Sequence, residues 1–459
     1  MNVRSLLFLA LTAAAPALAQ EPAPPAPLPS TAPAPLAVQT AAGPTAPAPA
    51  RLTLQEALRQ ALTANPVLGR TRAEVAALQA QADVAFSSIL PKIGFQGNFT
   101  RNDQEVSFGD GDDSRVILAE NDWSYRLTLS QPVYAGNRER KAINQARLNV
   151  DVARQGVADT EEQLILNVAS NYLAVVQAEE LLAVEQRNLE LARRRRDQAQ
   201  IFFDAGETTR VDVLRADADI KGAERRIAAA RQAREVAVGN LRLGLAVDGP
   251  IEVVAPGEFL PALPGEAALV AEAEANRPEV AQALANQEIA RLEVAKQRGA
   301  YLPVVTADGA WIKQRAAFPT DEYGQLSLRF SVPIYSSGEL KGRIAIAQER
   351  QRQAELRVQE VQQAVREEVR QALVDLETSA ASLQLAREQL TAAEAEYEQA
   401  TELYRAQELT SLEVESAETS VAEARRAVAN SQLDRALAEL RAWSAAGLLK
   451  KTIPSEGVR

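Results

Sequence analysis

The chain contains no cysteine, no histidine and a single methionine among its 459 residues. Without cysteine it cannot build a disulfide framework, a thiolate metal site or a lipid-modified N-terminal cysteine. Without histidine it lacks the commonest general base and the commonest metal ligand. The remaining acids are spread as helix-surface charge, with no nucleophile beside a base. We therefore expect no enzyme, no cofactor and no metal site.

The composition also excludes several partners and energy sources. The formal net charge of -11 argues against a surface that binds phosphate backbones, so we expect no nucleic-acid partner. No GxxxxGK[ST] segment is present, so the chain shows no nucleotide-binding loop of that type. No run of about 20 apolar residues follows the N-terminal segment, and a membrane-spanning helix is not expected.

The N-terminal residues predict export from the cytoplasm. MNVRSLLFLALTAAAPALAQ has a basic Arg4, an apolar run from Leu6 and small residues at Ala17 and Ala19. This is the pattern of a secretory signal peptide, which we place at residues 1–19. Residues 20–50 are mostly Pro, Ala, Ser and Thr, a composition that favours extended chain over a packed core, and we expect a flexible linker there.

The rest of the chain consists of two copies of one unit. Asn65-Pro66 recurs as Arg277-Pro278 after a shift of 212 residues, whereas Pro132 recurs as Pro333 after a shift of 201. The first copy therefore carries an insert 11 residues longer, between about 101 and 122, and insertions of this kind collect at loop tips. We expect the polar FGDGDD stretch of this insert to form an outward-facing loop.

These shifts place the boundaries of the copies. We expect a first repeat at 51–250, a Pro- and Gly-containing connector at 251–265, a second repeat at 266–447 and a C-terminal tail at 448–459. Within each repeat the order is helix, strand, strand, very long helix, sharp turn and helix.

Two strands in each copy are predicted by apolar residues that alternate with polar ones. The second strand of the second copy alternates cleanly, whereas the stretch from Val304 to Ile312 does so less clearly. The apolar set that alternation places on one face is Ile93, Phe95, Phe99, Trp123, Tyr125, Leu127, Leu129, Leu326, Leu328 and Phe330. Strands of about 10 residues can cross a bilayer, but four cannot close a barrel, so several chains would have to share one. The alternative is a pair of soluble hairpins packed on the helices.

A helical period follows each hairpin and continues for about 67 residues, from about 137 to 203 in the first copy, which spans roughly 100 Å. Apolar residues recur every seven positions at Val168, Val175, Leu182 and Leu189, and after a shift of 201 at Val369, Leu376, Leu383 and Leu390. Such heptads are typical of coiled-coil packing. The shorter helices are expected at about 52–88, 209–246, 266–299 and 409–446.

Each long helix ends in a sharp turn. Gly206 can adopt the left-handed conformation that ends a helix, and Thr209 with Asp212 has the spacing of a capping box. Thr410 and Glu413 stand in the same relation in the second copy. Helix capping is therefore the structural interpretation of both acids.

These features together resemble the TolC-like outer-membrane efflux channel family. The resemblance rests on the signal peptide, LTLQEAL, the NP dipeptide, the duplicated LP and QPVY segments and FDAGETTRVDVLRA, and it covers about 51–447. It implies a mainly α fold with a pair of β-hairpins, in which three chains share a 12-stranded outer-membrane β-barrel. That barrel would be continuous with a 12-helix periplasmic α-barrel, and QPVYAGN would form the junction.

The resemblance also implies a function and a set of partners. The protein would be a homotrimer in the outer membrane that extends into the periplasm. It would serve as a passive exit duct of a tripartite efflux or type I secretion system, opened when a periplasmic adaptor and an inner-membrane pump dock at the helical tips. Docking is expected at Gly206, Glu207, Thr208, Thr209, Gln407, Glu408, Leu409 and Thr410.

In the family, polar links between a carboxylate after the first turn and a tyrosine before the second hold the tip closed. These positions match Asp212 and Tyr404, and an acidic ring position matches Glu413. The next family acid falls on Ser416, with Glu415 close by. A family glycine and a family arginine correspond to Gln407 and Leu409, so the bonds of this gate are expected to differ in detail.

Two questions stay open at this stage. The run Arg193–Arg196 fits a solvated or salt-bridged helix face, and adaptor docking is its alternative. The main rival function is a periplasmic structural or adaptor coiled coil, which would need the long helices but not amphipathic hairpins rich in aromatic residues. The cargo is not encoded in any recognisable motif.

Overall fold

A computed structural model describes residues 50–109, 115–257, 260–315, 321–406 and 408–452 of the chain. The chain divides into two units, Met1–Ala48 and Pro49–Arg459, and every described residue belongs to the second. The expected signal peptide and nearly all of the expected linker lie outside the described residues, as do Gln407 and residues 453–459. No helix in the described part is long and apolar enough to span a membrane.

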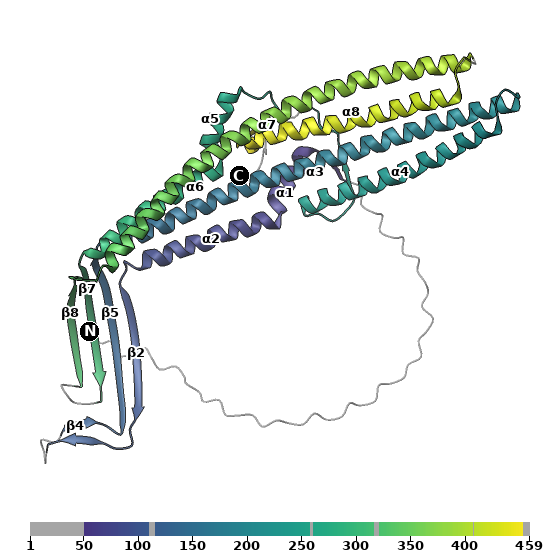
Figure 1. Cartoon of the computed structure of the whole chain (residues 1–459). Helices are drawn as coiled ribbons and strands as arrows, with labels where there is room; N and C mark the ends of the chain where they lie inside the picture. The colour runs from purple at the N-terminus through teal and green to yellow at the C-terminus, as the bar shows by residue number, and fades with distance from the viewer. Residues whose placement is uncertain (1–49, 110–114, 258–259, 316–320, 407, 453–459) are drawn as a thin grey trace, which may run out of the picture. The chain divides into compact units, whose positions relative to one another are not determined.

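The same order of elements occurs twice (Figure 1). The first copy comprises α1 (Leu54–Ala64), α2 (Pro66–Ser87), β2 (Lys92–Arg101), β5 (Asn121–Ala135), α3 (Arg138–Asp204) and α4 (Arg210–Leu245). The second comprises α5 (Glu266–Asn276), α6 (Pro278–Arg298), β7 (Val304–Gln314), β8 (Glu322–Ser331), α7 (Glu339–Arg405) and α8 (Ser411–Ala445). Helices α3 and α7 have 67 residues each, as the heptads predicted.

The expected helices at 52–88 and 266–299 are each two helices, so these two predictions were wrong in that respect. The breaks fall at Asn65 and Arg277, which precede prolines and have extended ψ angles of 123° and 128°. Both residues also cap a distant helix end. The Asn65 side chain donates to the Gly244 carbonyl, and that of Arg277 donates to the carbonyl of Ala445, which is the equivalent position 201 residues later.

The four strands form one antiparallel sheet in the order β2-β5-β7-β8, so the hairpins of the two copies pair with each other through β5 and β7. Strand β5 continues through Pro132 to Ala135 with a register shift, whereas β8 ends at Ser331. Most of the FGDGDD stretch, for which a loop is expected, lies outside the described residues, but the described part of the long insert has strands. It contains a second small antiparallel sheet of β3 (Val106–Phe108) and β4 (Arg115–Leu118), while its tip at 110–114 lies outside the described residues.

Each strand-to-helix junction turns through two successive residues with positive φ. These are Gly136 and Asn137, with φ of 65° and 59°, and at the equivalent positions Ser337 and Gly338, with φ of 49° and 85°. Gly136 has a second constraint, because a Cβ atom there would overlap the carbonyl oxygen of Gly299 in the short 3₁₀ helix η2 (Gly299–Tyr301). The junction therefore depends on a close backbone approach between the two copies.

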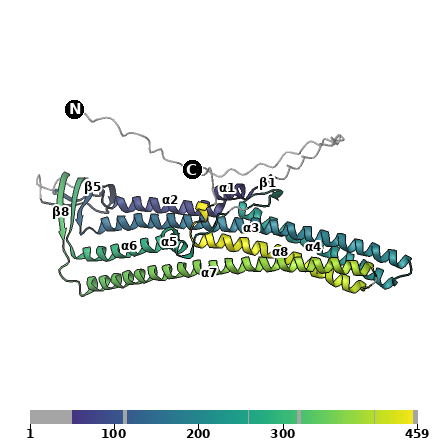
Figure 2. The same cartoon turned by 90° about the horizontal axis from the view of Figure 1, so that it is seen from above.

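The helices form layers that change their members along α3 and α7 (Figures 1 and 2). Near the sheet, neighbouring helices contact each other in the order α2-α3-α6-α7. Towards the distal turns, α4 and α8 replace α2 and α6, and the order becomes α4-α3-α8-α7. Each long helix thus connects the sheet to a distal turn.

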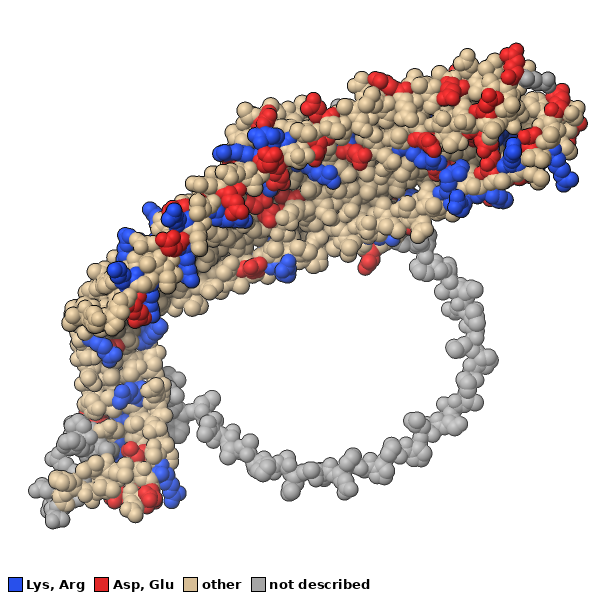
Figure 3. All heavy atoms as spheres, viewed as in Figure 1, with Lys and Arg blue, Asp and Glu red and all other residues tan. Residues whose placement is uncertain are grey.

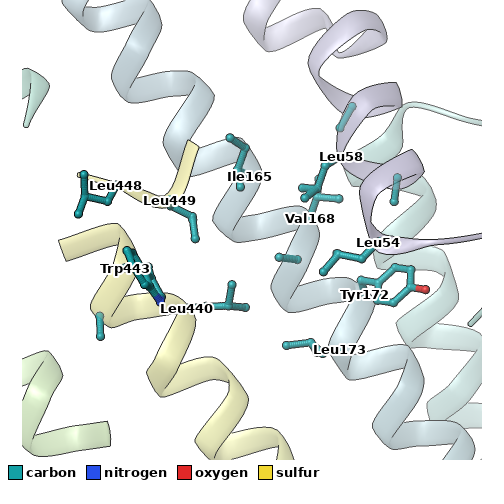
Figure 4. Packing of buried hydrophobic residues seen from close by; sticks show 14 of the residues in the cluster. Leu54, Leu58, Ile165, Val168, Tyr172, Leu173, Leu440, Trp443, Leu448 and Leu449 are labelled. Atoms are coloured by element: carbon teal, nitrogen blue, oxygen red, sulfur yellow. The ribbon is translucent and has the colours of Figure 1, made fainter. Parts of the chain in front are cut away.

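The largest hydrophobic core lies at the middle of α3, where α1, α3, α4 and α8 meet (Figure 4). Tyr172 is fully buried there, and its hydroxyl lies within hydrogen-bond distance of the carbonyls of Leu52 and Val254 and accepts a bond from the Val254 amide at 3.1 Å. These carbonyls border a small parallel sheet of β1 (Ala50–Leu52) and β6 (Ile251–Val253), which ties the start of the first repeat to the connector. Leu449, in the expected tail, begins α9 (Leu449–Thr452) and is also fully buried in this core.

Candidate functional sites

The register of the sheet places all ten residues of the predicted apolar set on one face. Ile93, Phe95 and Phe99 pair with Leu129, Leu127 and Trp123, and directly opposed residues of an antiparallel pair point to the same side. Leu326, Leu328 and Phe330 join them through Gly309, Ala307 and Val305. Leu326 is 88% exposed and Ile93 74%, so this face is uncovered in the single chain.

Trp311 belongs to the same face and was not identified from the sequence. It pairs with Leu127 on one side and Gly324 on the other, and its indole Nε1 donates to Glu322 at 3.1 Å. The alternation of β7 is difficult to recognise because Ala307 and Gly309 occupy the positions before it on this face. Tyr125 lies between Trp123 and Phe95, with ring centroids 5.3 and 6.1 Å away, so aromatic rings cluster on the β2 and β5 part of this face.

The opposite face of the sheet is polar. Ser130 donates to Asp308 at 2.6 Å, and the guanidinium of Arg329 lies 3.9 Å from the same carboxylate. Short neutral side chains such as Thr128 and Ser327 occupy much of the remaining surface. The sheet therefore has one apolar and one hydrophilic face, as alternation predicted.

Asp212 combines the expected capping role with a contact between the two repeats. Its Oδ2 accepts hydrogen bonds from the hydroxyls of Thr208 and Thr209 at 2.7 and 2.8 Å and from the Thr209 amide at 3.3 Å. Its Oδ1 accepts one from Ser411 at the start of α8, at 3.2 Å. Bonds from Thr208 and Thr209 lower the pKa of this carboxyl, so Asp212 is ionised at neutral pH.

Tyr404 packs against the α7–α8 cluster around Val414 and also contacts the first repeat. Its ring is 5.6 Å from that of Phe202 on α3, at an interplanar angle of 58°. Burial raises the pKa of the phenol, and the negative charge of Asp212 raises it further. The structure thus brings Tyr404, Asp212 and Ser411 together at the tip.

Glu413 occupies the equivalent capping position in the second copy without a contact to the first. It accepts bonds from the Thr410 amide and hydroxyl at 2.9 and 2.8 Å, and these bonds lower the pKa of the carboxyl. Glu415 is half-buried two residues further along α8. Neither acid is joined to Asp212 or Tyr404 within one chain.

The expected docking residues form the two distal turns between α3 and α4 and between α7 and α8. Gly206 has a φ of 77°, as its helix-ending role requires. Thr208 and its equivalent Leu409 are half-buried, and the others described there are exposed, namely Gly206, Glu207, Thr209, Glu408 and Thr410. Among the residues the structure describes, no group of acidic residues has an arrangement that could hold a metal ion.

Polar bonds join the two repeats along the distal half of α3, and we call this line of contacts the seam. It comprises Gln177–Asn430 at 2.8 Å, Glu185–Arg426 at 2.6 Å and Arg195–Glu418 at 3.0 Å, all between α3 and α8. In contrast, α7 and α8 share two small hydrophobic clusters of their own, around Val421 and around Val414. Figure 3 shows acidic and basic side chains interspersed over these helices.

Two side chains of the seam each bind both neighbouring helices. Arg195 binds Glu418 on α8 and Asp219 on α4. Glu185, which is 6% exposed, binds Arg426 on α8 and Arg226 on α4. Burial raises the pKa of Glu185, but the bonds from Arg426 outweigh it and the net shift is downward. Part of the run Arg193–Arg196 is therefore a salt-bridged face, since Arg196 also pairs with Asp217 at 3.2 Å.

Comparison with known proteins agrees with this geometry. Residues 57–246 and 269–447 match the family described as outer membrane efflux protein. The outer membrane efflux protein BepC of Brucella suis is 25% identical over 347 residues, covering 74% of each chain. The outer membrane protein TolC of Escherichia coli K12 is 24% identical over 364 residues, covering 74% of this chain and 71% of TolC.

A solved structure supports the fold. The open state of the Neisseria gonorrhoeae MtrE outer membrane channel superposes with a TM-score of 0.72 at 20% identity, covering 86% of this chain and 88% of that one. The family match extends over both repeats and excludes only the N-terminal segment, the connector region and the end of the chain. This chain therefore belongs to the outer membrane efflux protein family, and it is an outer-membrane channel extending into the periplasm rather than an enzyme.

Proposed function

We propose that three copies of this chain form a passive exit duct across the outer membrane and the periplasm, serving a tripartite efflux or type I secretion system. The sheets would close into a 12-stranded barrel whose apolar face contacts lipid. The helices would continue it as a 12-helix tunnel. The observation that carries the proposal is the sheet itself, because one chain exposes an apolar face and two unpaired edge strands, β2 and β8.

The physical argument is that the apolar face suits lipid, whereas the open edges of the sheet are not stable in a membrane. Unpaired backbone groups of an edge strand cost several kcal/mol each in lipid, so an open sheet cannot span it. Closure with neighbouring copies satisfies both edges at once. Alternation with one apolar and one polar face is the pattern of a barrel that has lipid outside and water inside.

The distal turns would form the gate. The bond from Ser411 to Asp212 and the tilted ring contact of Tyr404 with Phe202 support a closed tip in which α7 and α8 are held to α3 and α4. With three copies, Asp212 and Glu413 would supply six acids around one opening, and a ring of acids favours cations. Glu415 would add to this acidic mouth.

A periplasmic adaptor and an inner-membrane pump are the proposed partners. The exposed turns are where α3 leads into α4 and α7 into α8, so they present short polar groups to a partner. Charge reversal at Glu207 or Glu408 should abolish export while leaving assembly intact. Export that persists in both variants would move docking to the helix sides.

The barrel assignment is tested by comparing arginine substitutions on the two faces of β5. Leu127→Arg places a charge in the proposed lipid face, where arginine costs about 2–4 kcal/mol at mid-membrane, whereas Thr128→Arg places it in the aqueous lumen. We expect the first to abolish the detergent-extracted, heat-resistant trimer and the second to preserve it. Equal damage by both, or a soluble periplasmic monomer for the unmodified chain, would contradict the proposal.

A further inference from the structure

The polar face of the sheet holds one arginine that no acid neutralises. Arg126 lies near the middle of β5, opposite Gln96 on β2 and Ile312 on β7. Neither neighbour can pair with a guanidinium charge. Arg126 is exposed, and it has no ion pair or hydrogen bond to any part of the chain that the structure describes.

The carboxylates of this face are too distant to compensate the charge. Asp122 lies four residues before Arg126 on the same strand, and Asp308 faces Ser130, four residues after it. Four residues of strand span roughly 13 Å. Asp308 is also engaged, since it accepts a bond from Ser130 and lies beside Arg329.

We infer that Arg126 is a specificity-determining residue of the proposed pore, which gives the strand-lined part a preference for anionic groups. This inference rests on the proposed function, because the polar face must line the lumen. Three copies would bring three unpaired guanidinium groups to one height, and each donates to carboxylates, phosphates or sulfonates in pairs of bonds. The acidic distal mouth and the basic strand region would then favour opposite charges at the two ends of one path.

The electrostatic field of Arg126 can be measured in purified protein, without measuring ion conduction through a channel. The chain has no cysteine, so Gln96→Cys introduces a single thiol directly opposite Arg126. In detergent-purified protein, the thiol should react faster with an anionic methanethiosulfonate than with a cationic one, relative to a free thiol. Adding Arg126→Gln should lower this rate ratio about tenfold, as expected for one charge about 6 Å away acting with opposite sign on the two reagents.

The matched control is Lys313→Gln, which removes one positive charge at nearly the same height from the opposite face. Lys313 pairs with Tyr125 in register and lies 3.4 Å from Glu322. Lys313→Gln should leave the ratio of the two reaction rates unchanged, and Arg126→Lys should also preserve this ratio. Raising the salt to about 1 M should reduce the ratio without any substitution at 126, because screening then acts within about 3 Å. An unchanged ratio in Arg126→Gln, or an equal change in Lys313→Gln, would overturn the inference.

Reversal potentials in planar bilayers then separate this inference from the proposed function. In a potassium chloride gradient, Arg126→Gln should shift selectivity towards potassium, while Lys313→Gln should not. If the channels conduct and Arg126→Gln has the same ion selectivity as the unmodified chain, the inference is refuted and the proposed channel function stands. A purified protein that forms no channels would instead contradict the proposed function, while the thiol rates would still report the field at Arg126.

Discussion

At the scale of single residues, a comparison of Asp212 with Glu413 distinguishes a role in helix capping from a role in gating. They occupy equivalent positions 201 residues apart, and each accepts bonds from the amide and hydroxyl of its N-cap threonine. Only Asp212 also accepts a bond from the other repeat, at Ser411. The two acids therefore share the bonds to the N-cap threonine and differ in two contacts, the bond from Thr208, whose equivalent is Leu409, and the bond from Ser411 in the other repeat.

This difference leads to a conductance prediction. Asp212→Ala, alone or with Tyr404→Phe, should raise single-channel conductance in planar bilayers, because it removes the bond that holds α8 to the start of α4. Glu413→Ala removes an equivalent cap and should leave the conductance unchanged, although losing an exposed acid should weaken cation selectivity. Equal conductance in correctly inserted Asp212 and Glu413 variants would leave both residues as caps.

Glu162 predicts a pH dependence of stability. Its carboxylate is buried on α3, one oxygen has no partner in the described structure, and burial raises its pKa from 4.5 to about 7. A raised pKa means that the folded state holds the proton more tightly. The contribution to stability is therefore full below pH 4.5 and is lost as pH rises through about 7.

Glu162→Gln should consequently raise the midpoint of thermal unfolding at pH 8 and change it little at pH 4.5, as followed by circular dichroism. The neighbouring Glu161 provides the control, because it is paired with Arg72 at 3.0 Å and with Lys450. Glu161→Gln should lower the midpoint at pH 8. No gain for Glu162→Gln at pH 8 would show that surrounding charges, Arg277 above all, already compensate the carboxylate.

At the scale of elements, the sequence predicted features that depend on local pattern. Heptads and the absence of proline were sufficient for α3 and α7, and alternation was sufficient for β2, β5 and β8. The breaks at Asn65 and Arg277 were missed because helices lie on both sides of each one, and only the proline that follows marks the boundary. Strands β1 and β6 have three residues each and pair across about 200 positions, so no local period marks them.

The candidate gate likewise has features that the sequence predicted and features that it did not. Capping boxes are local and were predicted from Thr209 with Asp212 and from Thr410 with Glu413. The contacts of Asp212 with Ser411 and of Arg195 with both Asp219 and Glu418 were not, because each depends on how α3, α4 and α8 pack. The sequence repeat does not predict these contacts, because the two repeats contribute different residues to the two sides of the seam.

The seam yields a prediction with a matched control. Glu418→Gln with Arg426→Gln removes the α3–α8 pairs, yet Arg195 keeps Asp219 and Glu185 keeps Arg226. Asp219→Asn with Arg226→Gln instead removes the two α3–α4 pairs made by Arg195 and Glu185. The other α3–α4 pairs, Arg196–Asp217 and Glu179–Arg234, stay in place. Partly exposed pairs contribute up to about 1 kcal/mol each, so the loss of two pairs in the first double variant should shift the ratio of separated to closed seams by up to about thirtyfold.

Spin labels can measure that shift, because the chain has no native thiol. Labels at Ile201 on α3 and Thr419 on α8 should report a longer distance population in the first double variant only. Labels at Gln399 on α7 and Thr419 should not change in either, since α7 and α8 keep their own hydrophobic clusters. Dilution with unlabelled chain restricts the signal to one copy. Identical distances in both double variants would refute the seam as a separable contact.

At the scale of the whole molecule, the single chain exposes apolar surface at both margins of its helical layers. Leu243 on α4 is 80% exposed and Val84 on α2 69%, while Leu385 and Ile346 on α7 are 65% and 56% exposed. These helices are the outer members of the orders α2-α3-α6-α7 and α4-α3-α8-α7. The strand edges β2 and β8 are the corresponding margins of the sheet. One copy therefore leaves apolar side chains and strand edges uncovered at both margins, and a closed ring of copies would cover them.

Disulfide trapping between β2 and β8 tests this closure directly. Within one chain β5 and β7 separate these strands, so they lie roughly 14 Å apart, whereas a disulfide needs Cβ atoms within about 4.5 Å. A cysteine at Gln96 or Asn98 combined with one at Gln325 or Ser327 can therefore cross-link only separate copies. In membranes treated with a mild oxidant, at least one pair should give a ladder that ends at three chains on a denaturing gel. The pair Asn98 and Ser124, which face each other across β2 and β5, should close within one chain and give no ladder. If the β2–β8 pairs stay monomeric while that control closes, the edges are not joined between copies and the sheet does not form a shared barrel.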